Sequence, residues 1–286
     1  MGDIGRIGLV VHPARNVDGA LQAVRAWAGE HGAQTVQVIV PSQQREVAEP
    51  APAAECDIVV AIGGDGTMLA ATHAAAAADR PVLGIACGSL GVLTSVTAER
   101  IRTAMDRFNG GDWIPMALPA LVVDREDGER LIAFNDIAIV RHGQGQLRAT
   151  VKADGVLFTR FAGDGCIVST PVGSSGYTLA AGGPLLAPGI AAFVMTPLNV
   201  HGGSHAPLVL SAESELELNT IVGYGGARVE IDGQVGDVPI GWLRITFTSA
   251  AATVVTFADQ EPLLTRLRRR QILVDSPRII AEDRRV

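Results

Sequence analysis

The chain has 286 residues, 48% of them hydrophobic, which is enough apolar material for two domains or one large one. Its formal net charge of −7 argues against a broad surface for nucleic acid or anionic membrane, because such a surface needs clustered positive charge. No apolar run approaches the roughly 20 residues of a membrane-spanning helix, and we expect no membrane contact. A small charged ligand needs only a local site and stays allowed.

The three cysteines, Cys56, Cys87 and Cys166, are far apart and lie in apolar or glycine-rich segments. An odd number of cysteines without metal-ligand spacing is typical of reduced thiols and not of a disulfide framework or a zinc site. The N-terminus also lacks the apolar run of a signal peptide. We therefore expect a cytoplasmic protein.

Residues 1–110 alternate short β-branched runs with helical patterns. The expected strands are 6–11, 35–40, 57–62 and 81–85, and the expected helices contain 21–28 and 68–78. Alternating strands and helices predict an α/β domain with a parallel sheet. Ligand sites of such sheets lie at the carboxyl ends of the strands.

Residues 111–262 have a different pattern, in which short strands are separated by polar turns such as Asp154-Gly155 and Asp232-Gly233. The expected strands are 121–123, 133–141, 147–153, 208–210, 216–218, 228–231, 243–248 and 253–257. This part is predicted to be an all-β domain. Residues 263–270 return to a helical pattern with a basic face, and a last short strand is expected at 272–274.

A glycine-rich loop, Gly63-Gly64-Asp65-Gly66-Thr67, directly follows the expected strand 57–62 and precedes an alanine-rich helix. Backbone N–H groups of such a loop can cradle an anion at the positive end of a helix, and Asp65 could accept a proton or hold a metal. This combination indicates phosphoryl transfer. The alternative is a tight turn in which the aspartate caps the helix.

Lys152 is the single lysine of the chain, and no Gly-x-x-x-x-Gly-Lys pattern is present. A P-loop and a protein-kinase fold each need a lysine at the phosphates. A protein of this composition that handles nucleotide phosphates must rely on backbone amides, arginines and metal.

Two further segments carry candidate ligand groups. Asn135-Asp136 interrupts an apolar strand, and a side-by-side amide and carboxylate suit the hydroxyls of a ribose, although a bulge or a turn would also explain them. The long segment 163–184 is rich in glycines and hydroxyl groups that allow close approach of a ligand, and Tyr177 offers an aromatic face. His201 and His205 have i, i+4 spacing, but the glycines between them argue against a helical metal site.

Together these segments resemble the NAD kinase family, within the superfamily that also holds diacylglycerol and sphingosine kinases. The resemblance covers the whole chain. It rests on Gly63–Thr67, on 81–94, on Asn135-Asp136, on Asp164-Gly165, on 170–184 and on Asp232-Gly233-Gln234. The first motif is shared with the lipid kinases, whereas the long motif 170–184 points to NAD kinase.

The resemblance implies transfer of the γ-phosphoryl group of ATP to the 2′-hydroxyl of the adenosine ribose of NAD, which gives NADP. Mg²⁺ or another divalent cation would accompany ATP, without metal ligands from the protein. Asp65 would be the proton acceptor. The phosphates would be positioned by Gly63, Gly64, Gly66 and Thr67, and NAD would be bound by Asn135, Asp136, Asp164, Ser175, Gly176, Tyr177, Thr178 and Gln234, with His201 as a further candidate.

The resemblance also implies an architecture and an assembly. Residues 1–110 would form the α/β domain, 111–262 the β-rich substrate-binding domain, and 263–286 would pack back on the first. The protein would be a homodimer or homotetramer.

Three positions depart from the family pattern. Ala86 replaces an asparagine, Ala180 replaces a serine and Ala206 replaces an arginine. A hydrogen bond to a charged group is worth about 1.5–3 kcal/mol, enough to change substrate preference. A divergent paralogue that phosphorylates another nucleotide, a nucleoside or a small metabolite is therefore the main alternative. A lipid kinase is disfavoured because no basic amphipathic helix is evident, and a non-catalytic dinucleotide sensor because Asp65 is retained.

Overall fold

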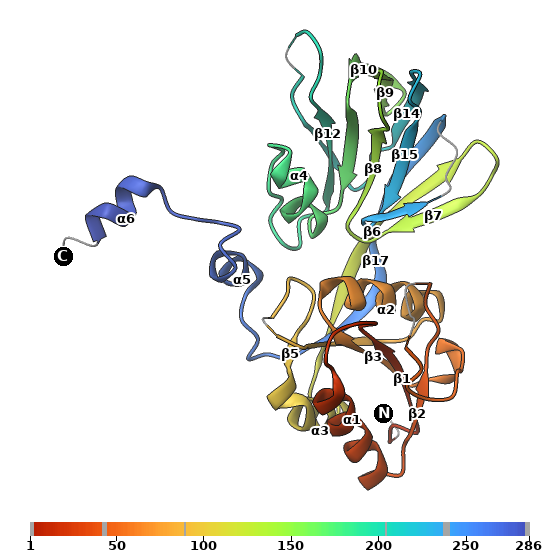
Figure 1. Ribbon diagram of the computed structural model, residues 1–286, viewed down its shortest axis with the longest axis vertical. Helices are drawn as coiled ribbons and strands as arrows, with labels where there is room; N and C mark the ends of the chain where they lie inside the picture. Colours follow the sequence, from red (N-terminus) through yellow and green to blue (C-terminus); the bar gives the residue numbers. More distant parts are fainter. Residues whose placement is uncertain (1–2, 42–44, 89, 204, 237–240, 284–286) are drawn as a thin grey trace. The chain divides into compact units, whose positions relative to one another are not determined.

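The structure is a computed structural model that describes residues 3–41, 45–88, 90–203, 205–236 and 241–283 (Figure 1). Ser89 and Ser204, which belong to segments discussed above, lie outside the described residues. The chain divides into two compact units. Unit 1 comprises Met1–Met116 with Ala252–Val286, and unit 2 comprises Ala117–Ala251.

Unit 1 is built on a parallel sheet. Its strands are β1 (Arg6–Val11), β2 (Gln34–Gln37), β3 (Ile58–Gly63), β4 (Val82–Ala86), β5 (Val96–Thr97) and the end of β17 (Trp242–Thr256). The order is β17-β4-β3-β1-β2, and β5 pairs with β4. Val254 of β17 pairs in parallel with Val82, so the chain returns to this sheet after completing unit 2.

Helices cover both faces of this sheet (Figure 1). They are α1 (Asp18–Glu30), α2 (Asp65–Ala77) and α3 (Ile101–Asn109), with short 3-10 turns η1 (Ala53–Glu55) and η2 (Ala98–Arg100). α1 and α3 pack on one face, where Trp27 and Phe108 are almost fully buried in one apolar cluster with the strands. α2 packs on the other face and buries Met68 completely. This packing leaves the start of α2 at the carboxyl end of β3.

The C-terminal segment packs back on unit 1 through α5 (Leu263–Arg269), whose Leu267 is only 1% exposed. The strand predicted at 272–274 is wrong. Gln271 adopts a left-handed φ of 58°, and the Ile272 N–H donates to the Leu267 carbonyl at 3.0 Å, so this stretch forms the turn that ends α5. Helix α6 (Pro277–Asp283) follows.

Unit 2 contains two sheets with a shared apolar core, in which Val151 of one sheet and Val168 of the other are both fully buried. The first sheet is antiparallel and has the order β13-β12-β11-β8-β15-β16. The second has the order β10-β9-β14-β17, with β6 pairing with β17 and β7. The strands are β6 (Ile114–Arg125), β7 (Arg130–Ala133), β8 (Asp136–Arg141), β9 (Leu147–Ala153), β10 (Val156–Gly163), β11 (Gly165–Ser169), β12 (Ala192–Leu198), β13 (Leu208–Ser211), β14 (Leu216–Val222), β15 (Ala227–Ile231) and β16 (Gln234–Gly236).

The predicted fold class is confirmed: a parallel α/β part, a β-rich part, and a C-terminal segment that returns to the first. The long glycine and hydroxyl segment forms a 3-10 turn, η3 (Gly173–Ser175), and a short helix, α4 (Tyr177–Ala180). None of the described helices is long and apolar enough to cross a membrane.

Candidate functional site

The glycine-rich loop forms the junction between β3 and α2, as predicted. Gly63 is the last residue of β3, and a Cβ there would lie 2.4 Å from Thr67 Oγ1, so only glycine leaves room for the buried Thr67 side chain. Gly64 is the N-cap of α2. Helix geometry leaves the N–H groups of the first turn without intrahelical acceptors, which makes this end of α2 suited to an anion.

Asp65 does not cap α2, because its carboxylate is held from outside the helix. The Val92 N–H donates to Oδ2 at 2.9 Å and the Leu93 N–H donates to Oδ1 at 3.0 Å. The Arg270 guanidinium, 205 positions away in the sequence, donates to Oδ2 at 2.9 Å. The side chain remains 30% exposed, so the carboxylate is fixed in orientation and reachable from solvent.

Gly91 packs directly against this carboxylate. A Cβ at Gly91 would lie 1.9 Å from Asp65 Oδ1, far inside contact distance, and the Gly91 N–H donates to Thr94 Oγ1 at 2.7 Å. The loop that follows β4 therefore shapes a fitted cradle for one carboxylate. We expect that any side chain at position 91 displaces Asp65.

A second arginine lies over the glycine loop. Arg15 follows β1, the neighbour of β3 in the sheet, and its Nη1 would lie 3.2 Å from a Cβ on Gly64. The ring Nδ1 of His12 accepts the backbone N–H groups of Ala14 and Arg15 and fixes this turn. Burial lowers the pKa of His12, and the nearby Arg15 adds to that shift, which favours the neutral ring that can accept these bonds.

In unit 2, Asp232 ties down the Asn135-Asp136 pair. Its carboxylate accepts the backbone N–H groups of Phe134 at 3.0 Å, Asn135 at 2.6 Å and Asp136 at 3.2 Å. Asp136 is itself buried, and burial, reinforced by the carboxylates of Asp232 and Glu230, raises its pKa to about 7. Near neutral pH, Asp136 can therefore carry a proton and donate a hydrogen bond.

This raised pKa predicts an unusual pH dependence of stability. In the unfolded chain the pKa of an aspartate is near 3.8, so between about pH 4 and pH 7 the folded state holds a proton that the unfolded state releases. The free energy of unfolding should therefore fall as pH rises through this window. A pKa change from 3.8 to about 7 corresponds to a loss of about 4 kcal/mol above pH 7. Asp136→Asn should lack this loss.

Urea unfolding of the wild type and of Asp136→Asn between pH 4.5 and pH 8 measures how the free energy of unfolding of each protein depends on pH. Asp164→Asn is the matched control, because the Arg141 guanidinium and the Asn199 amide hold the pKa of Asp164 below its usual range. Its curve should run parallel to that of the wild type in this window, since Asp164 is ionised in both states. If the free energy of unfolding of Asp136→Asn also ran parallel to that of the wild type, the raised pKa of Asp136 would be contradicted.

The glycine and hydroxyl motif packs against the Asn135-Asp136 pair. The Thr170 N–H donates to the Asn135 carbonyl at 2.9 Å, and Thr170 Oγ1 donates to the Phe134 carbonyl at 2.7 Å. A Cβ at Gly173 would lie 2.0 Å from the Asn135 carbonyl oxygen, which explains the glycine there. These contacts bring two separately predicted motifs together.

Tyr177 is 39% exposed and offers its ring to solvent. Burial raises the pKa of Tyr177; the carboxylates of Glu230, Asp136 and Asp164 add to that shift, and the Arg228 guanidinium opposes it. Thr178, in contrast, is fully buried and shares a hydrogen bond of 2.6 Å with Ser169. Ser175 Oγ donates to the Val172 carbonyl at 2.9 Å, and Gly176 is exposed beside it.

The remaining predicted residues of unit 2 lie around Asp164 and β16. Asp164 accepts hydrogen bonds from Arg141 and Asn199, which lower its pKa. His201 Nδ1 contacts the Gln146 amide at 2.7 Å. Gln234, at the start of β16, is exposed, and no described partner fixes its side chain.

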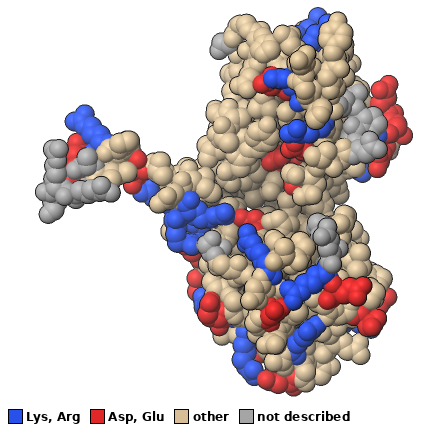
Figure 2. Space-filling view, in the orientation of Figure 1, with Lys and Arg blue, Asp and Glu red and all other residues tan. Residues whose placement is uncertain are grey.

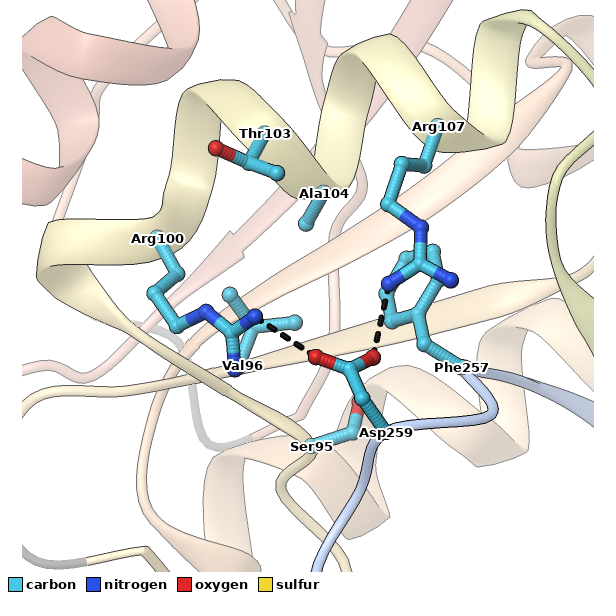
Figure 3. Close-up of a pocket in the computed structure, with 8 residues that line it drawn as sticks. All are labelled: Ser95, Val96, Arg100, Thr103, Ala104, Arg107, Phe257 and Asp259. Atoms are coloured by element: carbon cyan, nitrogen blue, oxygen red, sulfur yellow. Dashed lines mark hydrogen bonds and ion pairs between the residues drawn. The ribbon is translucent and has the colours of Figure 1, made fainter.

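A small pocket in unit 1 lies beside α3 and does not include the glycine loop. Its lining residues are Ser95, Val96, Arg100, Thr103, Ala104, Arg107, Phe257 and Asp259 (Figure 3). Arg100 and Arg107 point at the Asp259 carboxylate at 2.6 and 2.7 Å, and they lower its pKa to about 2. These ion pairs attach the segment after β17 to η2 and α3, so we interpret the pocket as structural.

Several candidate residues of the site were not indicated by the sequence. They are Arg15, the 91–93 cradle of Asp65, Asp232 as an anchor of 134–136, and Arg270. Gly91 lies within 81–94, one of the segments that resemble the family, and the basic face of 263–270 was also evident from the sequence. Neither pattern indicated that these residues contact Asp65. Among the described residues no group of three His, Cys, Asp or Glu side chains could hold a metal ion.

Two family models match the chain. The ATP-NAD kinase N-terminal domain matches residues 7–113, and the ATP-NAD kinase C-terminal domain matches residues 132–255. The NAD kinase of Gemmatimonas aurantiaca is 34% identical over 217 residues, which is 74% of this chain and 72% of that protein. NAD kinase 1 of Streptomyces coelicolor is 30% identical, over 98% of this chain and 89% of that protein.

Solved structures have the same fold. Yeast NADH kinase complexed with NADH gives a TM-score of 0.78 at 19% identity, covering 96% of this chain and 90% of that chain. An NAD kinase from Archaeoglobus fulgidus in complex with ATP gives a TM-score of 0.71 at 22% identity, covering 94% of this chain and 100% of that chain. With the family models matching both parts of the chain, these findings confirm the resemblance: the chain belongs to the NAD kinase family.

Proposed function

We propose that this protein is an NAD kinase, which transfers the γ-phosphoryl group of ATP to the 2′-hydroxyl of the adenosine ribose of NAD and releases NADP and ADP. The observation that carries the proposal is the oriented carboxylate of Asp65, held by Val92 and Leu93 at the start of α2, in a chain of this family. A base in this position takes the proton of the attacking hydroxyl as the new P–O bond forms.

The donor phosphates are assigned to the glycine loop. Gly64, Gly66 and Thr67 offer backbone N–H groups at the positive end of α2, and Gly63 permits the close packing of the turn. The Thr67 hydroxyl is buried against Gly63, so the role proposed for Thr67 falls on its backbone. The divalent cation enters as part of the substrate, Mg·ATP, and neutralises phosphate charge there.

The dinucleotide is assigned to the predicted residues of unit 2. Asn135 lies beside Gly173, and with the adjacent Asp136 it would offer an amide and a carboxyl group for ribose or base edges. The exposed ring of Tyr177 provides a stacking surface, with Ser175 and Gly176 next to it. We assign Asp164, Gln234 and His201 to the edge of the dinucleotide site, and the buried Thr178 would support that site through its hydrogen bond with Ser169.

A panel of acceptors tests the proposal. Purified protein with Mg·ATP is incubated separately with NAD, NADH, adenosine and diacylglycerol, and the products are identified by mass spectrometry. We expect NADP from NAD, with adenosine and diacylglycerol unchanged. Turnover of another acceptor without NADP formation would contradict the proposal and favour the divergent paralogue, for which the substitutions at Ala86, Ala180 and Ala206 argue.

We further propose a cytoplasmic homodimer or homotetramer. The three free cysteines are compatible with a reducing compartment, since Cys56 and Cys166 are buried and burial raises the pKa of all three thiols. Light scattering of the purified protein decides the assembly, and a monomer at micromolar concentration would contradict it.

A further inference from the structure

Phosphoryl transfer from ATP brings a polyphosphate next to the catalytic carboxylate, so the site needs cationic groups. The single lysine, Lys152, lies on β9 of unit 2 and pairs with Glu217 at 3.3 Å. Arginines therefore have to supply the cationic side chains. Arg15 lies over the glycine loop, and Arg270 lies on Asp65 itself.

Helix α5 is docked on the loop that holds Asp65. Leu267 is buried, and Arg266 Nη1 donates to the Thr94 carbonyl at 3.0 Å, one residue beyond the amides that bind the carboxylate. The Nε of Arg266 is buried without a hydrogen-bond partner in the described part of the chain. Burial lowers the pKa of Arg266, and the carboxylates of Glu261 and Asp65 oppose this shift. The docking of α5 places Arg270 at the site.

The arginines at the end of α5 are distributed over three carboxylates. Arg268 pairs with Asp275 at 2.7 Å, Arg269 with Glu261 at 3.1 Å and Arg270 with Asp65 at 2.9 Å. Figure 2 shows Lys and Arg side chains gathered over α5. Arg270 thus differs from its neighbours, because its partner is the proposed base of the reaction.

The Arg270–Asp65 pair is well suited to be exchanged. The two side chains are 34% and 30% exposed, and ion pairs of such exposure contribute little free energy. A guanidinium group binds phosphate oxygens with two parallel hydrogen bonds, and a triphosphate carries more charge than one carboxylate. When Arg270 moves away from Asp65, a lone pair on Oδ2 also becomes free, and this lone pair can accept the proton of the acceptor hydroxyl.

We propose that Arg270 is a phosphate-binding residue of the donor site, which leaves Asp65 for the phosphates of ATP and so exposes the carboxylate as donor binds. The inference rests on the proposed function and adds a residue to the same site. It assigns to the C-terminal segment a part in binding the donor, beyond the packing of α5 on unit 1.

Equilibrium binding of Mg·ATP, without acceptor, tests this in an Asp65→Asn background. In that background Arg270 has lost its carboxylate, so a second change at position 270 reports only the contact of Arg270 with nucleotide. We expect Asp65→Asn/Arg270→Ala to bind Mg·ATP about tenfold more weakly than Asp65→Asn, the loss of a hydrogen bond to a charged group. Asp65→Asn/Arg270→Lys keeps the positive charge but not the planar guanidinium group, and its affinity for Mg·ATP should lie between those of the other two variants.

Asp65→Asn/Arg268→Ala is the matched control, because Arg268 stands two positions away and pairs with Asp275. It should bind Mg·ATP like Asp65→Asn, and melting temperatures should show that α5 remains folded in each variant. Equal affinities of Asp65→Asn with and without Arg270, or an equal loss on removing Arg268, would overturn the inference. The readout is binding, so failure to form NADP in the acceptor panel would refute the proposed function separately.

Discussion

Asp65→Asn should lower kcat for NADP formation by about 10²- to 10⁴-fold, the usual contribution of a positioned base. The amide keeps the size of the side chain and one acceptor oxygen for the 92–93 amides, but it cannot take a proton. NAD binding should be retained, since the residues assigned to the dinucleotide are unchanged. Steady-state kinetics and calorimetric titration with NAD separate the two effects.

Asp275→Asn is the matched control for this variant, because it removes the carboxylate partner of Arg268 from the same C-terminal segment. Its kcat should stay close to that of the wild type. Near-normal turnover of Asp65→Asn would remove Asp65 from the role of base. A loss of NAD binding as large as the loss of turnover would instead assign Asp65 to substrate binding.

Gly91→Ala should lower kcat by about 10²-fold or more, comparable with removal of a positioned base. The new Cβ would lie 1.9 Å from Asp65 Oδ1 and 2.4 Å from Cγ, so the carboxylate has to leave its position or the loop has to move. Either response breaks the hydrogen bonds from Val92 and Leu93. Initial rates with saturating Mg·ATP and NAD measure the effect.

Gly29→Ala provides the control for an added methyl group. Gly29 lies in α1, where a Cβ would meet nothing within 4 Å. That variant should keep full activity and gain up to about 1 kcal/mol of stability, the difference in helix propensity between alanine and glycine. Wild-type activity of Gly91→Ala, with the protein folded by circular dichroism, would show that the cradle does not set the geometry of Asp65.

The parts of the fold that the sequence predicts are those set by local periodicity. The β-branched runs that became β1, β3 and β4 and the helices between them were each indicated by their own residues. The turn at 271–272 shows the limit of this reasoning, because Ile272 to Val274 read as a strand by composition. Their conformation follows from the backbone hydrogen bond between the Ile272 N–H and the Leu267 carbonyl, which ends α5.

The candidate site, too, could be predicted from the sequence only in part. The glycine loop could be predicted because strand, turn and helix follow one another within a few residues. The partners of Asp65 could not, since Arg270 lies 205 positions away and pairs through the tertiary fold. Asp232 likewise reaches Asn135 across 97 positions, although both residues were recognised separately as parts of motifs.

The central claim is that this chain moves the γ-phosphoryl group of ATP to the 2′-hydroxyl of NAD with Asp65 as the base. A single-turnover reaction with γ-labelled ATP and NAD, followed by analysis of the labelled dinucleotide by phosphorus NMR, tests it most directly. The account predicts label in the 2′-phosphate of NADP with the wild type and almost none with Asp65→Asn. Label on another hydroxyl, or equal labelling by the two proteins, would contradict it.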